Sequence, residues 1–299
     1  MALLVIGAFA APGSVSASGL LSMLPFMAVL GVASIGQHVV IQQRGLDLSA
    51  AGALSFAAVL VTALPARDAG VGETLGCVGL ALAMGLGAGL LNGIMVSALR
   101  VPALVTTIGV NALLIGATLI VSGGTPSSAP APLGQFALSR SIGVPNTIWV
   151  LIGITAVAAF VIARTGIGRR FIAVSVNPAA AYAIAIPVEL YRLVTYMFAG
   201  LCYALAGVML AGYLNVPSLF SGNPYMLATV AAVVVGGNSI AGGGRGSVLA
   251  TVIGAFFLTY LGQLVLSVGF ERSMQDIVQA IIVISGVALP VLMRRMRPA

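Results

Sequence analysis

The chain has 299 residues, of which 60% are hydrophobic and only 6% are charged, and its formal net charge is +7. A soluble domain carries about 25% charged residues, so this composition, with a mean hydropathy of +1.15, excludes a soluble globular protein. All thirteen basic residues are arginines, and the lack of lysine excludes a P-loop nucleotide site. With two well-separated cysteines and one histidine, we expect no metal site, no redox chemistry and no bound cofactor.

Nine apolar segments follow one another along the chain, and most approach the roughly 20 residues that a helix needs to cross a bilayer core. We therefore predict an all-α, polytopic transmembrane helical bundle in one domain, residues 1–299. Two segments, 50–65 and 225–236, are short and are expected to begin or end inside the protein as broken helices. Residues 1–19 are expected to be an incomplete first helix and its connection, so a natural start further upstream would give ten spans instead of nine. The segments are 20–43, 50–65, 72–98, 103–122, 147–163, 190–212, 225–236, 248–268 and 274–293.

The arginines are divided unequally between alternate connections. One set of connections holds ten of them and the other holds three, together with most of the acidic residues and the polar stretch 122–147. The positive-inside rule places the larger set, and the C-terminus, in the cytoplasm. The net positive charge therefore suits loops that face anionic lipid and does not predict nucleic-acid binding. The larger set is Arg44, Arg100, Arg164, Arg169, Arg170, Arg192, Arg245, Arg294, Arg295 and Arg297, and the smaller is Arg67, Arg140 and Arg272.

The longest cytoplasmic connection, residues 164–187, opens with basic residues and continues into a short predicted helix. Asn177 suits the N-cap and Pro178 the first helical position, and an alanine-rich run follows until Pro187 stops it. A short surface helix with small residues facing outward fits a cleft on a partner protein, but an amphipathic linker resting on the membrane explains the pattern equally well. The residues of interest are Gly168, Arg169, Arg170, Asn177, Pro178, Ala180 and Ala181.

A second cytoplasmic element is rich in glycine and has one charge, Arg245. Its spacing matches neither GxGxxG nor a P-loop, so a tight turn between two packed helices is favoured over a phosphate cradle. Earlier in the chain, Asp47 and Ser49 suit the cap of a helix, and Asp47 is within sequence reach of an ion pair with Arg44. The glycine-rich turn comprises Gly236, Gly237, Gly243, Gly244, Arg245 and Gly246.

Five motifs occur in a characteristic order. They are Gly45-Leu-Asp-Leu-Ser49, Leu91-Asn-Gly93 with Arg100-Val-Pro102, Thr165 to Ala181, Ala204-Leu-Ala-Gly207, and Val233 to Ser247. In this order and spacing the chain resembles the permease subunits of bacterial ABC importers for monosaccharides, of the ribose, xylose, arabinose and galactose type. The resemblance extends from residue 20 onward, and its specific parts are the third and fifth motifs.

The resemblance implies a half-transporter in the inner membrane of a bacterium. Two permease subunits, identical or related, would form the pore, and separate ABC ATPase subunits would dock on a coupling loop at 164–189. A periplasmic or lipid-anchored sugar-binding protein would deliver the substrate, and ATP binding would drive alternating access. The chain departs from the family where a glutamate is usual near Ala180 and Ala181, and where an acidic residue usually precedes the glycine-rich run but Ala228-Thr229 stands here.

Polar side chains inside apolar segments are candidates for a translocation path, because burying them in lipid is costly. Neutral amides suit sugar hydroxyls, although each could instead bond a neighbouring helix. A branched-chain amino-acid ABC permease is the alternative function, and an ion-coupled carrier or a membrane enzyme is less favoured because no mid-span acid, paired carboxylates or nucleophile–base pair is present. The candidates are Gln37, His38, Gln42, Asn92, Asn111, Gln263 and Gln279.

Overall fold

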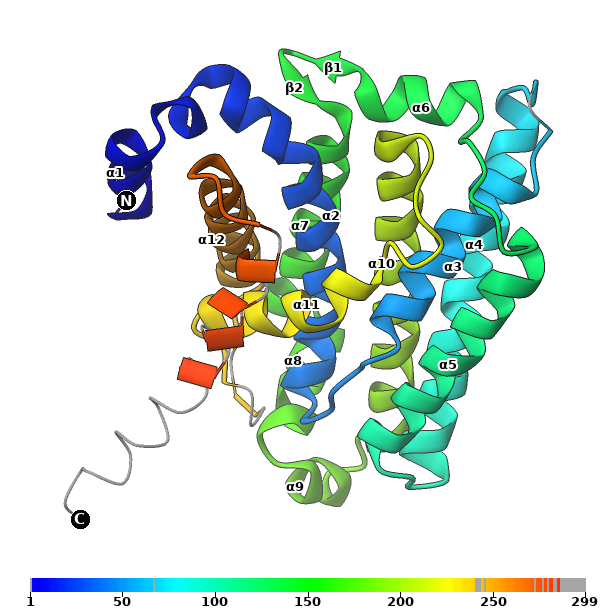
Figure 1. The fold of residues 1–299 in the computed structure, drawn as a ribbon. Helices are drawn as coiled ribbons and strands as arrows, with labels where there is room; N and C mark the ends of the chain where they lie inside the picture. The colour runs from blue at the N-terminus through cyan, green and yellow to red at the C-terminus, as the bar shows by residue number, and fades with distance from the viewer. Residues whose placement is uncertain are drawn as a thin grey trace.

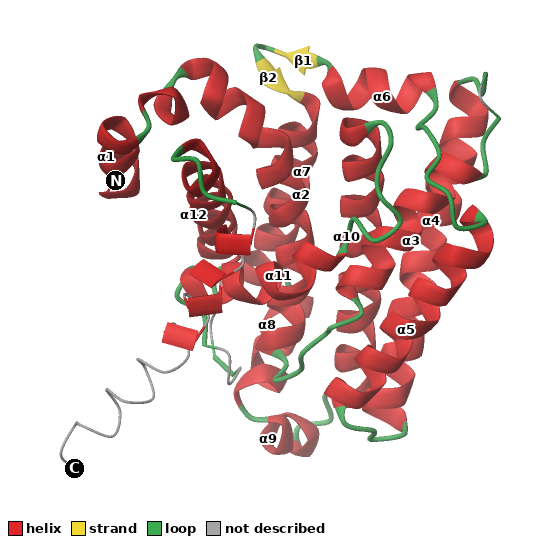
Figure 2. Ribbon diagram, viewed as in Figure 1, coloured by secondary structure: helices red, strands yellow, loops and turns green. Residues whose placement is uncertain are grey.

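A computed structural model describes residues 2–66, 68–239, 243–244 and 246–271, and the short pieces 273–275, 277–278, 280–281 and 284–285. Within these residues the protein is a helical bundle, as predicted (Figures 1 and 2). Six helices are long and apolar enough to cross a membrane, and two apolar helices are shorter. Most of the ninth predicted segment, 274–293, lies outside the described residues. The long helices are α2 Ala17–Gln42, α4 Val71–Gly93, α5 Ala103–Ser122, α7 Asn146–Arg164, α10 Val188–Leu214 and α12 Val248–Ser267, and the shorter ones are α3 Ala50–Ala63 and α11 Asn223–Val235.

Helices α2 and α10 form the centre of the bundle. Most of their residues are buried, whereas most residues of α4, α5 and α7 are not buried within the bundle, as expected for helices that face lipid. Helix α10 packs against α2, α3 and α4. Glycines allow the closest of these approaches: a Cβ on Gly89 of α4 would meet the backbone of Tyr196 in α10, and one on Gly200 would meet the carbonyl oxygen of Gly85. The spacing of four between these α4 glycines therefore marks a helix contact, as small-xxx-small patterns do.

The two short helices are the broken segments that the sequence predicts. In Figure 1 the chain turns back from the lower end of α2 to begin α3 inside the bundle, and returns from the upper end of α10 to begin α11. Ser55 in α3 accepts a hydrogen bond at 2.9 Å from the amide of Gly222, just before α11. Asn111 of α5 accepts one at 2.7 Å from the amide of Gly52. Side chains and neighbouring helices thus satisfy the backbone groups that a helix end leaves unpaired at membrane depth.

Short elements cover the two ends of the bundle, and several differ from the sequence-based expectation. The polar stretch 122–147 contains a helix and a β-hairpin, and the basic opening of the predicted coupling loop, 164–189, is itself helical. Thr165 starts that helix by accepting a hydrogen bond from the amide of Gly168 at 3.1 Å. The elements are α1 Ala2–Ala10, a 3-10 turn Pro12–Val15, a π-helical turn Ile94–Ala98, α6 Ala131–Leu138, the antiparallel pair β1 Arg140–Ser141 and β2 Val144–Pro145, α8 Gly166–Val176 and α9 Pro178–Ala183.

Helix α9 begins where it was predicted to begin. The Asn177 side chain accepts a hydrogen bond at 3.1 Å from the amide of Ala180, and Pro178 is the first helical residue. The helix ends at Ala183, earlier than the expected stop before Pro187, because Ala185 adopts a left-handed backbone conformation with φ of 60°. The alanine run therefore forms less than two turns of helix before the chain turns back toward α10.

Candidate translocation path and coupling face

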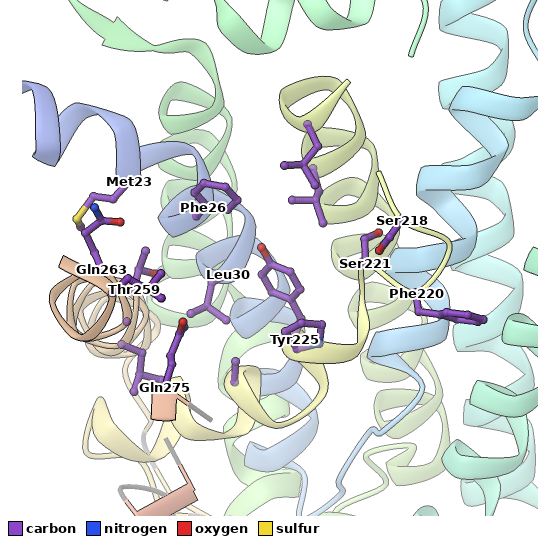
Figure 3. Close-up of a pocket in the computed structure, with 17 residues that line it drawn as sticks. Met23, Phe26, Leu30, Ser218, Phe220, Ser221, Tyr225, Thr259, Gln263 and Gln275 are labelled. Carbon is purple, nitrogen blue, oxygen red and sulfur yellow. The ribbon is translucent and has the colours of Figure 1, made fainter. Parts of the chain in front are cut away.

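A cavity of about 480 Å³ opens in the half of the bundle opposite α8 and α9. Helices α2, α10, α11 and α12 line it, together with the segment between α10 and α11 (Figure 3). Its walls are largely aliphatic, with aromatic rings and hydroxyl and amide side chains among them, and none of its described lining residues is charged. The labelled residues are Met23, Phe26, Leu30, Ser218, Phe220, Ser221, Tyr225, Thr259, Gln263 and Gln275.

We call this cavity, which lies at the end of the bundle away from α8 and α9 (Figure 1), the outer cavity. Its chemistry suits a neutral, polyhydroxylated molecule. Hydroxyl and amide groups both donate and accept hydrogen bonds, as sugar hydroxyls do. The rings of Phe26 and Tyr225 offer apolar faces for the C–H groups of a sugar ring, and the absence of charge among the described lining residues avoids strong trapping. The outer cavity includes Gln263, which the sequence singled out.

A second, smaller pocket of about 190 Å³ lies at the opposite end of α11, between α2 and the glycine-rich turn. His38 and Gln42 are 1% and 5% exposed and both line it. His38 Nδ1 lies 2.9 Å from the Thr251 hydroxyl, while His38 Nε2 and Gln42 Oε1 have no protein hydrogen-bond partner. Because buried polar groups are nearly always satisfied, these two atoms are suited to water or to a polar ligand in this inner pocket.

Apolar side chains separate the two cavities. Leu30 and Leu258 border the outer cavity and pack with Ala231 and Ala232 of α11, while Ile41 borders the inner pocket and packs with Val230 and Val233. From Leu30 to His38 the rise along α2 is about 12 Å at about 1.5 Å per residue. The structure therefore has an outer cavity and an inner pocket, with an aliphatic partition formed around α11. The partition consists of Leu30, Val230, Ala231, Ala232, Val233 and Leu258.

Hydrogen bonds join the predicted coupling loop to the end of α2 and to the glycine-rich turn. Gln42 accepts from the amide of Gly243 at 3.2 Å through its carbonyl and donates through Nε2 to the carbonyl of Gly244 at 3.3 Å. The Ser175 hydroxyl at the end of α8 donates to the same Gly244 carbonyl at 3.3 Å. Arg44 donates to the carbonyl of Val176 at 2.9 Å. We call this set of contacts the coupling junction.

The glycines of the turn make these close approaches possible. Gly237, Gly243 and Gly244 have positive φ values, which glycine adopts without strain. A Cβ on Gly246 would approach His38 to 2.8 Å, and one on Gly236 would meet the backbone of Ala250 in α12. The described glycines thus form a tight turn between packed helices, which is the interpretation that the sequence favours. Arg245 lies outside the described residues.

Comparison with known proteins identifies the family. The family model described as "Branched-chain amino acid transport system / permease component" matches residues 19–286. The chain belongs to this permease family. It is 29% identical over 293 residues to the ribose import permease protein RbsC of Escherichia coli (strain K12), covering 96% of this chain and 90% of that one. It is 30% identical over 258 residues to the autoinducer 2 import system permease protein LsrC of Escherichia coli (strain K12 / DH10B), covering 86% and 74% of the two chains. No solved structure matches it.

Several polar residues predicted to line the path of the permease form hydrogen bonds with neighbouring segments of the bundle. Tyr203 donates to Gln37 at 2.7 Å, Asn92 donates to the Ser49 hydroxyl at 2.8 Å, and Asn111 accepts from the amide of Gly52. These contacts correspond to the structural alternative, a bond to a neighbouring helix. Gln263 lines the outer cavity, and His38 and Gln42 line the inner pocket. Gln279 lies outside the described residues.

Sequence reasoning missed the loop that forms one wall of the permease's outer cavity. Ser218, Phe220 and Ser221 precede the short helix α11, and Tyr225 lies in its first turn. A search for amides within spans does not find hydroxyl and aromatic residues in a connection. A usable signal was present, however, because a run of serine, glycine, asparagine, proline and aromatics directly precedes a segment too short to cross a membrane.

On the coupling loop, the structure separates exposed from buried members of the predicted set. Ala180 is exposed on α9, as are Arg169 and Arg170 on α8, whereas Ala181 is only 2% exposed and packs with Val174. The expectation that both alanines face outward is therefore wrong for Ala181, because the turn at Ala185 folds the short helix back onto α8 and the start of α10. The exposed apolar side chains at this tip are Tyr182 and Ile184, each 70% exposed.

Asp47 is fully buried in the connection between α2 and α3, and it has a local structural role. Its Oδ1 accepts from the amide of Ser49 at 2.9 Å and from the Ser49 hydroxyl at 2.6 Å. No ion pair with Arg44 forms, because Arg44 is held by the Val176 carbonyl. Helix α3 has no side-chain cap, because the amide that Asp47 bonds is that of Ser49, which precedes the helix, while the amide of Gly52 in its first turn bonds Asn111. Both the capping prediction and the ion-pair prediction are therefore wrong.

Replacing Asp47 with alanine is expected to lower the free energy of unfolding by about 2 kcal/mol, since it leaves a buried amide and hydroxyl without their acceptor. Thermal unfolding of the purified permease in detergent would show this as a shift of several degrees. Asp47→Asn keeps an acceptor oxygen and should shift the midpoint less, and Asp68→Ala, at an exposed position, should not shift it. Equal midpoints for Asp47→Ala and Asp68→Ala would contradict a stabilising role for the hydrogen bonds between Asp47 and Ser49.

Proposed function

We propose that this chain is the membrane-spanning permease subunit of an ATP-driven (ABC) importer that carries a monosaccharide across the cytoplasmic membrane of a bacterium. The outer cavity carries the proposal: aromatic faces and neutral hydrogen-bonding groups line it, without a charged side chain among its described residues. The family match and the similarity to a ribose import permease and an autoinducer 2 import permease support it.

The two cavities suggest a path for alternating access. In this arrangement sugar enters the outer cavity, and the apolar partition around Ala231 and Val233 blocks its way to the inner pocket. A shift of α11 and α12 relative to α2 would open the partition on one side and close it on the other. Such a change is a population shift between two packed arrangements, biased by ATP binding to a separate subunit.

The coupling junction gives this motion a physical route. An ATPase that docks on the tip of α9 would move α8, and the end of α8 is hydrogen-bonded to the glycine-rich turn that leads into α12. The same turn bonds the end of α2, which lines both cavities. Displacement of α9 would therefore reach both walls of the proposed path. The proposed partners are ABC ATPase subunits, a sugar-binding protein outside the membrane, and a second permease subunit.

The alternative, import of branched-chain amino acids, fits the outer cavity less well. A zwitterion carries two charges, and buried charges are normally paired. The outer cavity offers neither a basic nor an acidic side chain among its described lining residues.

An uptake assay separates the two functions. Cells that express the chain, and cells from which its gene is deleted, would be given radiolabelled D-ribose, other pentoses and hexoses, and L-leucine. We expect the deletion to lower uptake of one sugar and to leave leucine uptake unchanged; loss of leucine uptake alone would contradict the proposal.

Gln263 provides a direct test of the outer cavity. Gln263→Leu keeps the approximate size of the side chain and removes its hydrogen-bonding amide, and a lost hydrogen bond of about 1 kcal/mol corresponds to about fivefold in affinity. We expect sugar uptake at low concentration to fall by about that factor while the amount of protein in the membrane stays constant. Gln135→Leu, an exposed change on α6, is the matched control. Equal uptake by both variants would exclude a role for Gln263 in the path.

A further inference from the structure

A third cavity, of about 500 Å³, lies between α7, α8 and α10 and is separate from the proposed path. Its walls are almost entirely aliphatic and aromatic, with Val39 of α2 among its lining residues. We call it the α7–α8–α10 groove. Its lining includes Val157 and Val161 of α7, Ile167 and Arg170 of α8, and Val194 and Phe198 of α10.

The α7–α8–α10 groove lies at the end of the bundle where α7 finishes and α10 starts, which is the end that carries the larger set of arginines. Its rim residues are apolar and open to the surroundings, with Ile167 64% and Val194 51% exposed. We expect a contiguous apolar opening beside a membrane-crossing helix to face acyl chains, because exposing this apolar surface to water is unfavourable.

Helix α8 marks the level of the lipid headgroups. It buries Phe171 and Val174 against the bundle and exposes Arg169 and Arg170, the pattern of a helix lying in a membrane interface. Arg170 is the one charged residue among the described residues that line the α7–α8–α10 groove. An apolar groove lined by a single exposed arginine is complementary to a molecule with a hydrocarbon body and a negatively charged head.

We propose that the α7–α8–α10 groove binds one phospholipid of the cytoplasmic leaflet with a net anionic headgroup, with an acyl chain against Val161, Val194 and Phe198 and the phosphate at Arg170. Charge complementarity selects this occupant, since basic pockets between helices on the cytoplasmic side favour anionic headgroups. A neutral sugar fits this groove poorly, because the walls offer few polar groups to bond its hydroxyls.

A bound lipid of this kind would connect the membrane to the coupling junction. The groove is roofed by α8, whose carbonyl at Phe171 accepts a hydrogen bond from Gln43 at 2.9 Å and whose end bonds Gly244 through Ser175. A lipid that fixes α8 against α7 and α10 would hold the coupling loop in one position. The lipid site itself depends only on the groove and Arg170, so its test is independent of whether the transported molecule is a sugar.

The experiment is native mass spectrometry of the full chain, reconstituted in nanodiscs of equal parts phosphatidylethanolamine and phosphatidylglycerol and then released into detergent. We expect one retained phosphatidylglycerol per chain in preference to phosphatidylethanolamine. Arg170→Gln should reduce this preference about fivefold, as expected for about 1 kcal/mol per basic residue near anionic lipid. Arg140→Gln removes the same charge from the hairpin at the opposite end and should leave the preference unchanged.

A second pair of variants tests the groove itself. Val194→Trp should fill the groove and lower retention of both lipids, whereas Leu113→Trp, at a 66% exposed position on α5, should not. Equal retention of the two lipids by the wild-type chain, or an unchanged preference in Arg170→Gln, would overturn the proposal. So would disulfide crosslinking of two Val194→Cys chains in the membrane, because the groove would then be occupied by a second copy.

Discussion

Gly89→Leu is expected to prevent α4 from packing on α10 and to remove folded protein from the membrane. A Cβ at this position would overlap the carbonyl oxygen of Tyr196 and approach the Cα of Met197 to 2.7 Å. These are backbone atoms of a buried central helix, so neither can move aside as a flexible side chain could. Overpacking alone costs about 1–3 kcal/mol, and separating two backbones along a helix contact adds to it. We therefore expect no monodisperse protein in detergent by size-exclusion chromatography.

The control for this prediction lies in the same helix. A Cβ on Gly87 would meet nothing within 4 Å, so Gly87→Leu adds the same side chain on the face of α4 that is open to lipid. It should express and elute like the wild type. If Gly89→Leu also folds normally, the close approach of α4 and α10 does not exist in the membrane, and the arrangement around α10 described above is wrong.

Removing the exposed side chains of the α9 tip is expected to lower energised transport at least tenfold without unfolding the permease. Tyr182 and Ile184 are each 70% exposed at the α9 tip, so neither side chain contributes to the packing of the bundle. Large apolar side chains of this kind commonly anchor protein interfaces, each contributing about 2 kcal/mol or more. The double change Tyr182→Ala with Ile184→Ala should therefore lower recovery of the partner ATPase, and sugar uptake, by at least tenfold.

Two comparisons make this result specific. Ile142→Ala removes an 89% exposed side chain from the hairpin at the other end of the bundle and should affect neither ATPase recovery nor uptake. The thermal unfolding midpoint of the double variant should equal that of the wild type, because neither side chain is part of the core. Unchanged ATPase recovery by the double variant would show that the ATPase docks elsewhere, and the coupling role of 164–189 would then be withdrawn.

The sequence predicts the helical class, the short α3 and α11, and the N-cap of α9 for clear physical reasons. Apolar length and arginine placement depend on the bilayer and need no knowledge of packing. Asn177 followed by Pro178 is a local signal, and the structure forms the expected hydrogen bond. Helix α8 was missed because its two glycines and paired arginines weaken the apolar pattern, although Thr165 is a suitable cap.

The functional residues are harder to predict than the spans. Gln37, Asn92 and Asn111 carry the same chemistry as Gln263, yet the first three bond neighbouring helices and the last lines the outer cavity. Only the three-dimensional arrangement shows which partner each amide finds. Similarly, Ala180 and Ala181 are adjacent and identical, but the left-handed turn at Ala185 decides that one is exposed and the other buried.

The measurement that tests the central claim most directly is affinity purification of the chain from its native membrane in mild detergent, followed by identification of the proteins that accompany it. The account predicts an ABC ATPase, and with it a sugar-binding protein whose bound ligand names the substrate. Recovery of the chain alone or only as a self-dimer, together with substrate transport in liposomes that lack ATP, would contradict the importer and indicate a carrier that works without an ATPase.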